Sequence, residues 1–144
     1  MKVLLGVHPP THGEAFIFGL SVRDDLSAIQ EVMGCCPQDD VLWTELTARD
    51  HLELYARFKG TPEAGLRTAV DTVLASVALL EDADQPVRNF SGGMKRRLSV
   101  GIAMIGTPQI IFLVRSSDYR SQADISVNVF CWVHRMSQRP AWTR

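Results

Sequence analysis

Cysteine is scarce in this sequence, and its arrangement excludes two common uses of the residue. Only three cysteines occur among 144 residues, and two of them are the neighbours Cys35 and Cys36. Adjacent cysteines do not give the spacing of a zinc site, and an odd total leaves one thiol outside any disulfide framework. The cysteine content therefore favours a reducing compartment, and we expect a cytosolic setting.

Long apolar runs and an excess of one charge are also missing. The most apolar segment, residues 98–114, is interrupted by glycine, proline, threonine and glutamine, whereas a membrane-spanning helix needs roughly 18 or more unbroken apolar residues. The apolar run near the N-terminus is too short for a signal peptide. The net charge of −1 provides no overall field that would attract nucleic acid. We therefore expect no transmembrane segment, no signal peptide and no nucleic-acid partner.

Apolar patterning predicts strands near both ends of the chain. Residues 14–20, EAFIFGL, are rich in aromatic and β-branched residues and follow a turn-like segment, which predicts a strand. Residues 109–114, QIIFLV, have the continuous apolar character of a buried parallel strand. Ser27–Met33 is expected to form a short helix that Gly34 ends, followed by a short apolar stretch that leads into a polar loop.

The middle of the chain carries the start and stop signals of three helices. Thr47 and Asp50 form a capping-box pattern for a helix that Gly60 ends. Thr61 is expected to cap a second helix, with Pro62 at its first position and apolar residues at helical spacing up to Val77. Ser91 is expected to cap a third helix, which ends near Ile105. Helices between two strand regions predict an α/β or α+β fold of one domain or part of one.

Ser91, Gly92 and Gly93 are the first candidates for a binding site. A hydroxyl and two residues without side chains at a helix start expose free backbone N–H groups at the positive end of the helix dipole, an arrangement that suits a phosphate. The same tripeptide is also common as a simple loop and cap. The basic residues Lys95, Arg96 and Arg97 that follow are typical of a solvated helix surface rather than of a nucleic-acid patch.

Four motifs occur in a characteristic order. These are GCCPQDDVLW around Gln38, LTARDHLELYARFKG, SGGMKRRLSV from Ser91, and the apolar strand QIIFLV. Together they resemble the nucleotide-binding domain of ABC transporters, and their amino-acid sequences are most similar to those of the A subfamily, whose members move lipids. The resemblance extends from about Lys2 to Leu113.

The resemblance implies a partial ABC-type P-loop ATPase fold of the α/β class, with a helical subdomain at about residues 44–106 and remnants of the core sheet within residues 1–113. It implies that Ser91, Gly92 and Gly93 are the signature motif, which binds the γ-phosphate of ATP held by a second nucleotide-binding domain in a head-to-tail dimer. Gln38 matches the Q-loop glutamine, which reaches Mg²⁺ and the attacking water while its loop contacts the transmembrane domain. ATP and Mg²⁺ are the implied cofactors, and the implied location is the cytoplasmic side of a membrane, through the transporter.

The sequence also departs from the family pattern. The G-x-x-x-x-G-K-[ST] loop that holds ATP phosphates does not occur, and Val114 and Arg115 stand where the family has Asp-Glu. Valine cannot coordinate Mg²⁺, and arginine cannot accept a proton from water. No catalytic residue or metal ligand is therefore predicted, and the sequence suggests a domain truncated at both ends. Residues 114–144 are expected to form a divergent, poorly ordered tail.

Two functions are consistent with these observations, and a third, in which the arginine-rich tail binds nucleic acid, ranks last because the tail has five arginines and no aromatic platform for stacking. The first is a fragment of the ATP-binding domain of a lipid-transporting ABC protein, unable to hydrolyse ATP by itself because positioning and charge stabilisation are nearly the whole of the catalysis. The second is a non-enzymatic interaction module that presents its signature motif to a complete nucleotide-binding domain.

Overall fold

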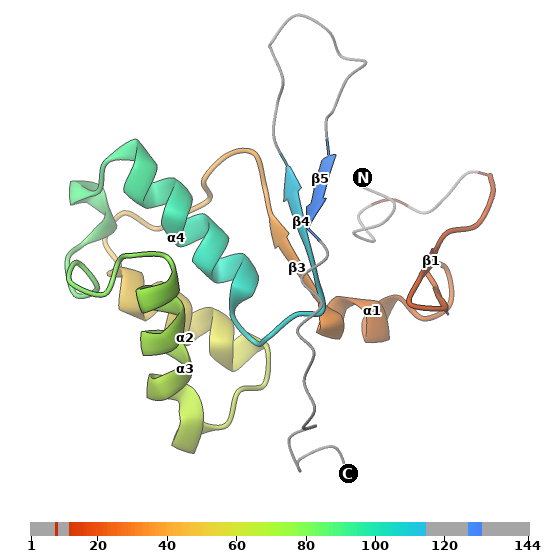
Figure 1. The fold of residues 1–144 in the computed structure, drawn as a ribbon, viewed down its shortest axis with the longest axis horizontal. Coiled ribbons are helices and arrows are strands. Elements are labelled where there is room, and N and C mark those ends of the chain that lie inside the picture. Colours follow the sequence, from red (N-terminus) through yellow and green to blue (C-terminus); the bar gives the residue numbers. More distant parts are fainter. Residues whose placement is uncertain (1–7, 9–11, 115–126, 131–144) are drawn as a thin grey trace, which may run out of the picture.

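The computed structural model describes residue 8, residues 12–113 and, for the backbone only, residues 114 and 127–130. A small parallel pair of strands stands between a block of three helices and a shorter N-terminal unit (Figure 1). The α/β class predicted from the sequence is confirmed. The described elements are β1 (Phe16–Ile17), β2 (Leu20–Ser21), α1 (Leu26–Val32), β3 (Met33–Cys36), α2 (Ala48–Phe58), α3 (Glu63–Ser76), the 3₁₀ turn η1 (Val87–Asn89), α4 (Gly92–Met104), β4 (Ile110–Val114) and β5 (Val127–Phe130).

The sheet joins segments from opposite ends of the chain. β3 pairs in parallel with β4, with Met33 opposite Ile110, so the predicted parallel strand at the end of the motif series is confirmed. β4 also pairs antiparallel with β5, which was not expected because it falls in the predicted tail. The rest of that tail lies outside the described residues.

Two sequence predictions in the N-terminal unit are corrected. The expected strand over residues 14–20 is instead the hairpin of β1 and β2, because Phe18 and Gly19 both have positive φ, as a tight two-residue hairpin turn requires. Gly34 does not end α1; the helix ends at Val32 and runs directly into β3, which occupies the apolar stretch expected before the polar loop. Gly34 lies inside that strand because the backbone of α4 packs against it.

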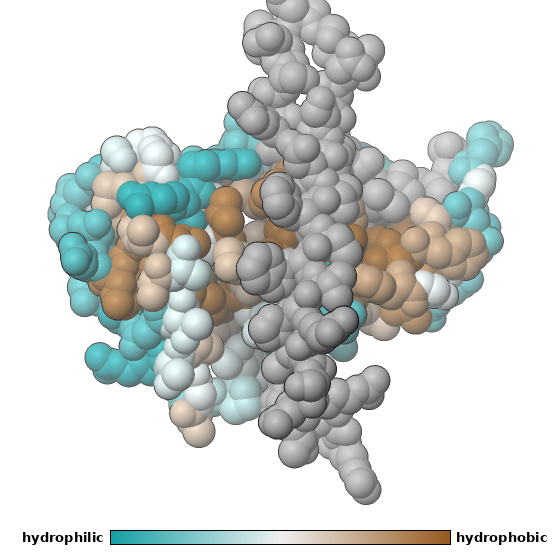
Figure 2. Space-filling model, viewed as in Figure 1, coloured by the Kyte–Doolittle hydropathy of each residue, from teal (hydrophilic) through white to brown (hydrophobic). Residues whose placement is uncertain are grey.

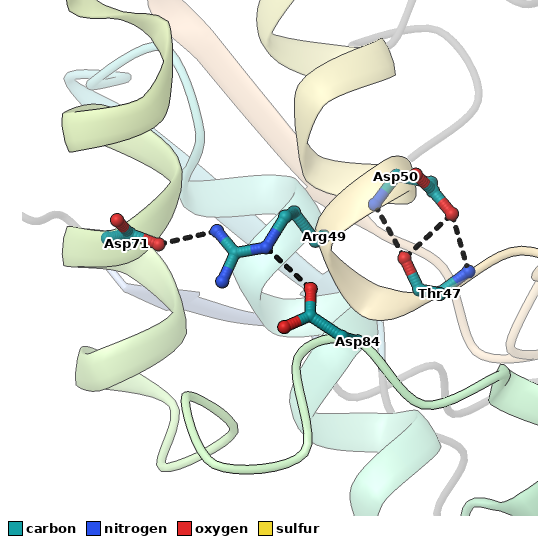
Figure 3. Close-up of polar contacts among 5 residues, drawn as sticks. All are labelled: Thr47, Arg49, Asp50, Asp71 and Asp84. Carbon is teal, nitrogen blue, oxygen red and sulfur yellow. Dashed lines mark hydrogen bonds and ion pairs between the residues drawn. The ribbon is translucent and has the colours of Figure 1, made fainter.

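The helical hairpin of α2 and α3 forms as predicted, with one shift at its junction. The Thr47 hydroxyl oxygen accepts from the Asp50 N–H at 3.0 Å, and the Asp50 carboxylate accepts from the Thr47 N–H at 3.0 Å, so the capping box is confirmed (Figure 3). The Thr47 hydroxyl also donates to the Asp50 carboxylate at 2.7 Å, and this bond, together with the one from the Thr47 N–H, lowers the pKa of the Asp50 carboxyl. Pro62, not Thr61, is the N-cap of α3, because the Thr61 N–H closes the end of α2 by donating to Ala56.

Two apolar clusters lie on opposite sides of the sheet. The smaller one packs β1, β2 and α1 against one face of β3 and β4, with Ile29, Met33 and Phe112 at its centre. The larger one fills the space between α2, α3 and α4 and contains thirteen buried residues: Ala48, Leu52, Ala56, Leu66, Val70, Leu74, Val77, Leu79, Ala83, Val87, Phe90, Leu98 and Ile105. The helical block therefore has a core of its own.

Polar bridges fix the helices to one another and to the sheet. The Arg49 guanidinium of α2 contacts Asp71 of α3 at 2.6 Å and Asp84 of the following loop at 2.7 Å (Figure 3). The Lys59 ammonium, just beyond α2, donates to the carbonyls of Gln30 at 2.7 Å and Met33 at 2.9 Å, where α1 meets β3. Burial lowers the pKa of Lys59. These contacts set the position of the helical block against the strands.

Candidate functional site

Ser91 begins α4 with the geometry of an N-cap. Its backbone is extended, with φ −64° and ψ 161°, and its hydroxyl oxygen accepts from the Met94 N–H at 3.3 Å. The predicted cap is therefore confirmed. The bond leaves the N–H groups of Gly92 and Gly93 without an acceptor in the described structure, as is usual for the first turn of a helix.

The space above the first turn of α4 is open. Ser91, Gly92 and Gly93 are all exposed, and a Cβ added to Gly92 would meet no atom within 4 Å. The same open space faces the N–H groups of Gly92 and Gly93 and the hydroxyl of Ser91. It also lies at the positive end of a thirteen-residue helix. The donor set fits a phosphate group and offers nothing to an apolar ligand.

Gln38 lies in the exposed loop that follows β3, and this loop is held against α4. The Arg96 guanidinium donates to the carbonyl of Pro37 at 2.6 Å and to that of Gln38 at 3.3 Å. The same nitrogen lies 3.6 Å from the carboxylate of Asp40, which also accepts from the Ser99 hydroxyl at 2.7 Å. The Gln38 loop and residues 91–93 are thus both connected to α4. No described hydrogen bond joins Gln38 directly to residues 91–93.

The basic run that follows residues 91–93 is therefore not simply a solvated surface, as the sequence suggested. Arg96 binds the Gln38 loop, and the Arg97 guanidinium donates to the carbonyl of Ala78 at 2.9 Å, just after α3. Ala78 has a positive φ of 52°, so its carbonyl falls outside the regular hydrogen bonding of the helix. A run of like charges along a helix does not reveal which member meets a backbone carbonyl from a distant segment.

The far end of the loop is fastened to α2 through a buried histidine. The Trp43 N–H donates to Nε2 of His51 at 3.0 Å, and Nδ1 of His51 lies 2.7 Å from the carbonyl of Thr47. Because Nε2 accepts, the proton is on Nδ1 and the ring is neutral. Two further bonds, from the N–H groups of Val87 and Arg88 to the carbonyls of Leu46 and Thr44, tie the segment after the loop to the segment before Ser91.

An aromatic surface adjoins this loop. Trp43 packs against His51 and Tyr55 with ring centroids 5.7 and 6.4 Å apart, and Tyr55 meets Phe58 edge-on at 6.1 Å. Phe58 is 72% exposed, Val41 69% and Trp43 49%. A row of apolar side chains that open to solvent is typical of a protein contact surface.

The resemblance noted in the sequence implies an Asp-Glu pair at the carboxyl end of β4. Val114 is the last residue of this strand, and Arg115 lies outside the described residues. Residues 12–114 contain no cluster of three or more histidine, cysteine, aspartate or glutamate side chains that could hold a metal ion. In the same part of the chain, no helix is both long and apolar enough to cross a membrane.

Comparison with known proteins identifies the fold around these motifs. The family model for ABC transporters matches residues 1–113. This chain belongs to the ABC transporter family. It is 47% identical over 111 residues to ABC transporter A family member 8 of Dictyostelium discoideum, and 44% identical over 115 residues to A family member 11 of Arabidopsis thaliana.

The shared region is a large part of this chain and a small part of its relatives. The two matches cover 77% and 78% of the chain but only 13% and 12% of the relatives, so this ABC family chain spans about an eighth of their length. A solved ATP-binding subunit of an ABC transporter superposes with a TM-score of 0.66 at 26% identity, over 78% of this chain and 47% of that one. The partial ABC-type fold expected from the sequence is confirmed.

Proposed function

We propose that this chain is part of the ATP-binding domain of an A-family ABC transporter, and that the part of it that acts in ATP binding is the signature motif. Ser91 and the N–H groups of Gly92 and Gly93 would bind the γ-phosphate of ATP held, with Mg²⁺, by a second nucleotide-binding domain. The observation that carries the proposal is the exposed start of α4, with two unpaired N–H donors and free space above them. The family's coupling of ATP hydrolysis to lipid transport is part of this proposal.

The chain itself is proposed not to hydrolyse ATP. Its 144 residues contain no G-x-x-x-x-G-K-[ST] loop, and Val114 ends the strand that would present the magnesium-ordering aspartate. Gln38 is the remaining polar side chain expected near Mg²⁺ and the attacking water, and it lies exposed in its loop. One amide cannot replace the missing lysine and carboxylates.

The proposal is tested by measuring equilibrium binding of ATP with Mg²⁺ by the chain alone, by an intact A-family nucleotide-binding domain alone, and by their mixture. We expect no tight binding by the chain alone and a gain in affinity of about tenfold in the mixture, the size of one or two charge-assisted hydrogen bonds. Ser91→Asp should abolish this gain, because aspartate preserves the helix cap but places a negative charge at the phosphate position.

The matched control is Ser76→Ala, which removes a serine near the end of α3, where its hydroxyl donates to the carbonyl of Val73. This variant should keep the full gain in the mixture. A gain that survives Ser91→Asp, no gain with the unmodified chain, or tight ATP binding by the chain alone would each contradict the proposed role of the signature motif.

A non-enzymatic interaction module is the second candidate function, and one observation favours it. The helices that carry the signature motif have their own thirteen-residue core, so the motif is supported without a phosphate-binding loop in the same chain. In the binding experiment, this function predicts that a catalytically complete partner changes its rate of ATP hydrolysis when the chain is added. If the partner's rate of ATP hydrolysis did not change, the interaction-module function would be contradicted and the first candidate function would stand alone.

The second proposed partner is the transmembrane domain of an ABC transporter, at the cytoplasmic side of the membrane. The aromatic surface beside the Gln38 loop, with Phe58 72% exposed, supports this contact. A photo-crosslinking residue at position 58 should capture the transmembrane domain of a co-expressed A-family transporter, and the same residue at the exposed position 81 should not. Equal capture from both positions would show that the aromatic surface does not select this partner.

A further inference from the structure

We propose that Arg96 is a positioning residue that fixes the Gln38 loop to the signature helix, so that occupation of the Ser91 site by phosphate is transmitted to the loop. This inference rests on the proposed function, because it needs the start of α4 to bind a ligand. It concerns the side chain that connects the two parts of the site.

The contacts of Arg96 set it apart from its neighbours on the helix. One guanidinium nitrogen is shared by the carbonyls of Pro37 and Gln38 and by the carboxylate of Asp40, at 2.6, 3.3 and 3.6 Å. These residues belong to a loop that precedes α2, far from α4 in sequence. Arg96 lies in the second turn of α4, close to the free N–H groups of Gly92 and Gly93.

A second side chain of α4 strengthens the same link. The Ser99 hydroxyl donates to Asp40 at 2.7 Å, and Ser99 is buried. Asp40 is therefore held from two positions one helical turn apart, and its side chain is only 26% exposed. Charge-assisted bonds of this kind are stronger than those between neutral groups. The loop has a rigid connection to the helix and not only to β3.

The ends of the loop are held by other elements, which isolates the role of Arg96. Before the loop, β3 is fixed by pairing with β4, and after it the Trp43 N–H is fixed by His51. Between these points, the described hydrogen bonds that reach residues 37–40 from another element come from Arg96 and Ser99. A small shift of α4 towards a bound phosphate would thus move the backbone of Gln38 with it.

Cys36 provides a native reporter of this connection. It immediately precedes Pro37, is fully buried, and its thiol lies 3.8 Å from the Pro37 carbonyl, which accepts from Arg96 at 2.6 Å. A buried thiol reacts with a reagent only when the structure opens locally. In a chain in which Cys35 and Cys131 are replaced by serine, the rate of N-ethylmaleimide labelling measures opening at the base of the loop.

The experiment compares Arg96→Ala with its neighbour Arg97→Ala in the chain alone. We expect Arg96→Ala to label about tenfold faster, because a charge-assisted hydrogen bond that closes the loop is lost. Burial raises the pKa of Cys36 and Arg96 lowers it, so loss of Arg96 would by itself slow the reaction, and acceleration reports access to the thiol. Arg97→Ala removes the same charge but an unrelated contact, and should label within threefold of the parent. Arg96→Lys, which retains a donor for Pro37, should restore most of the protection.

The same rate is then measured in the mixture with ATP and an intact A-family domain. We expect ATP to slow labelling of the parent chain at least threefold and to leave the Arg96→Ala rate unchanged. Equal acceleration by Arg96→Ala and Arg97→Ala, or by neither, would overturn the link. A gain in ATP binding without slower labelling of the parent would overturn its transmission to the loop. A parent mixture without any gain in ATP binding would overturn the proposed function, while the comparison in the chain alone still decides whether Arg96 holds the loop.

Discussion

Replacement of Gly34 by alanine should lower the free energy of unfolding by about 3 kcal/mol or more, the upper range for overpacking a tightly filled site. A Cβ at this position would lie 2.0 Å from the carbonyl oxygen of Ala103 and 3.0 Å from its carbonyl carbon. Both atoms belong to the backbone of α4, so no rotation of a side chain can relieve the contact. Urea denaturation of the full chain would measure the loss.

Gly65→Ala is the matched control for this prediction. Gly65 lies inside α3, and a Cβ there would meet no atom within 4 Å. Because alanine favours helix over glycine, this variant should be unchanged or more stable by up to about 1 kcal/mol. If Gly34→Ala were as stable as Gly65→Ala, β3 and α4 could not approach as closely as the structure shows.

Leu52→Ala should destabilise the chain by about 3 kcal/mol, within the range for truncation of a buried leucine. Leu52 is fully buried in the core of the helical block, and its side chain approaches Gly101 of α4, where Val73 of α3 and Val77 just after α3 also lie. Alanine would leave a cavity among three helices. The measurement is the midpoint of urea unfolding followed by helical circular dichroism, with an unchanged slope.

Leu80→Ala makes the same chemical change at a site where the side chain is 45% exposed. It should cost less than about 1 kcal/mol, because little apolar surface returns to water. Equal losses for the two variants would show that the three helices do not share a packed core. The leucine pair measures the stability contributed by the core of the helical block, and the glycine pair measures the stability contributed by the contact between α4 and β3.

Sequence predicted the parts of the site whose geometry is local. The caps at Thr47 and Ser91 each depend on residues at most three positions away, and both are confirmed. The order of the four motifs then predicted the family, because several weak signals in one order are far more specific than any of them alone.

The remaining parts depend on contacts between distant segments. Residues 33–36, MGCC, have neither alternation nor β-branched side chains, and they form β3 because β4 pairs with them. The role of Arg96 likewise depends on carbonyls of the Gln38 loop. The positive φ of Phe18, which divides the expected first strand into a hairpin, is unusual for an aromatic residue, and no local rule predicts it.

The parallel pairing of Met33 with Ile110 encloses the whole helical block between its two strands. Contacts among α2, α3 and α4 join residues that are comparatively close in sequence. The strand pairing instead closes one long loop, and its hydrogen bonds form only after the chain has lost the conformational entropy of that loop. We therefore expect the helices to assemble early in folding and the strands to join late. In the native chain the sheet would open first, and the helix that carries Ser91 would remain folded during that opening.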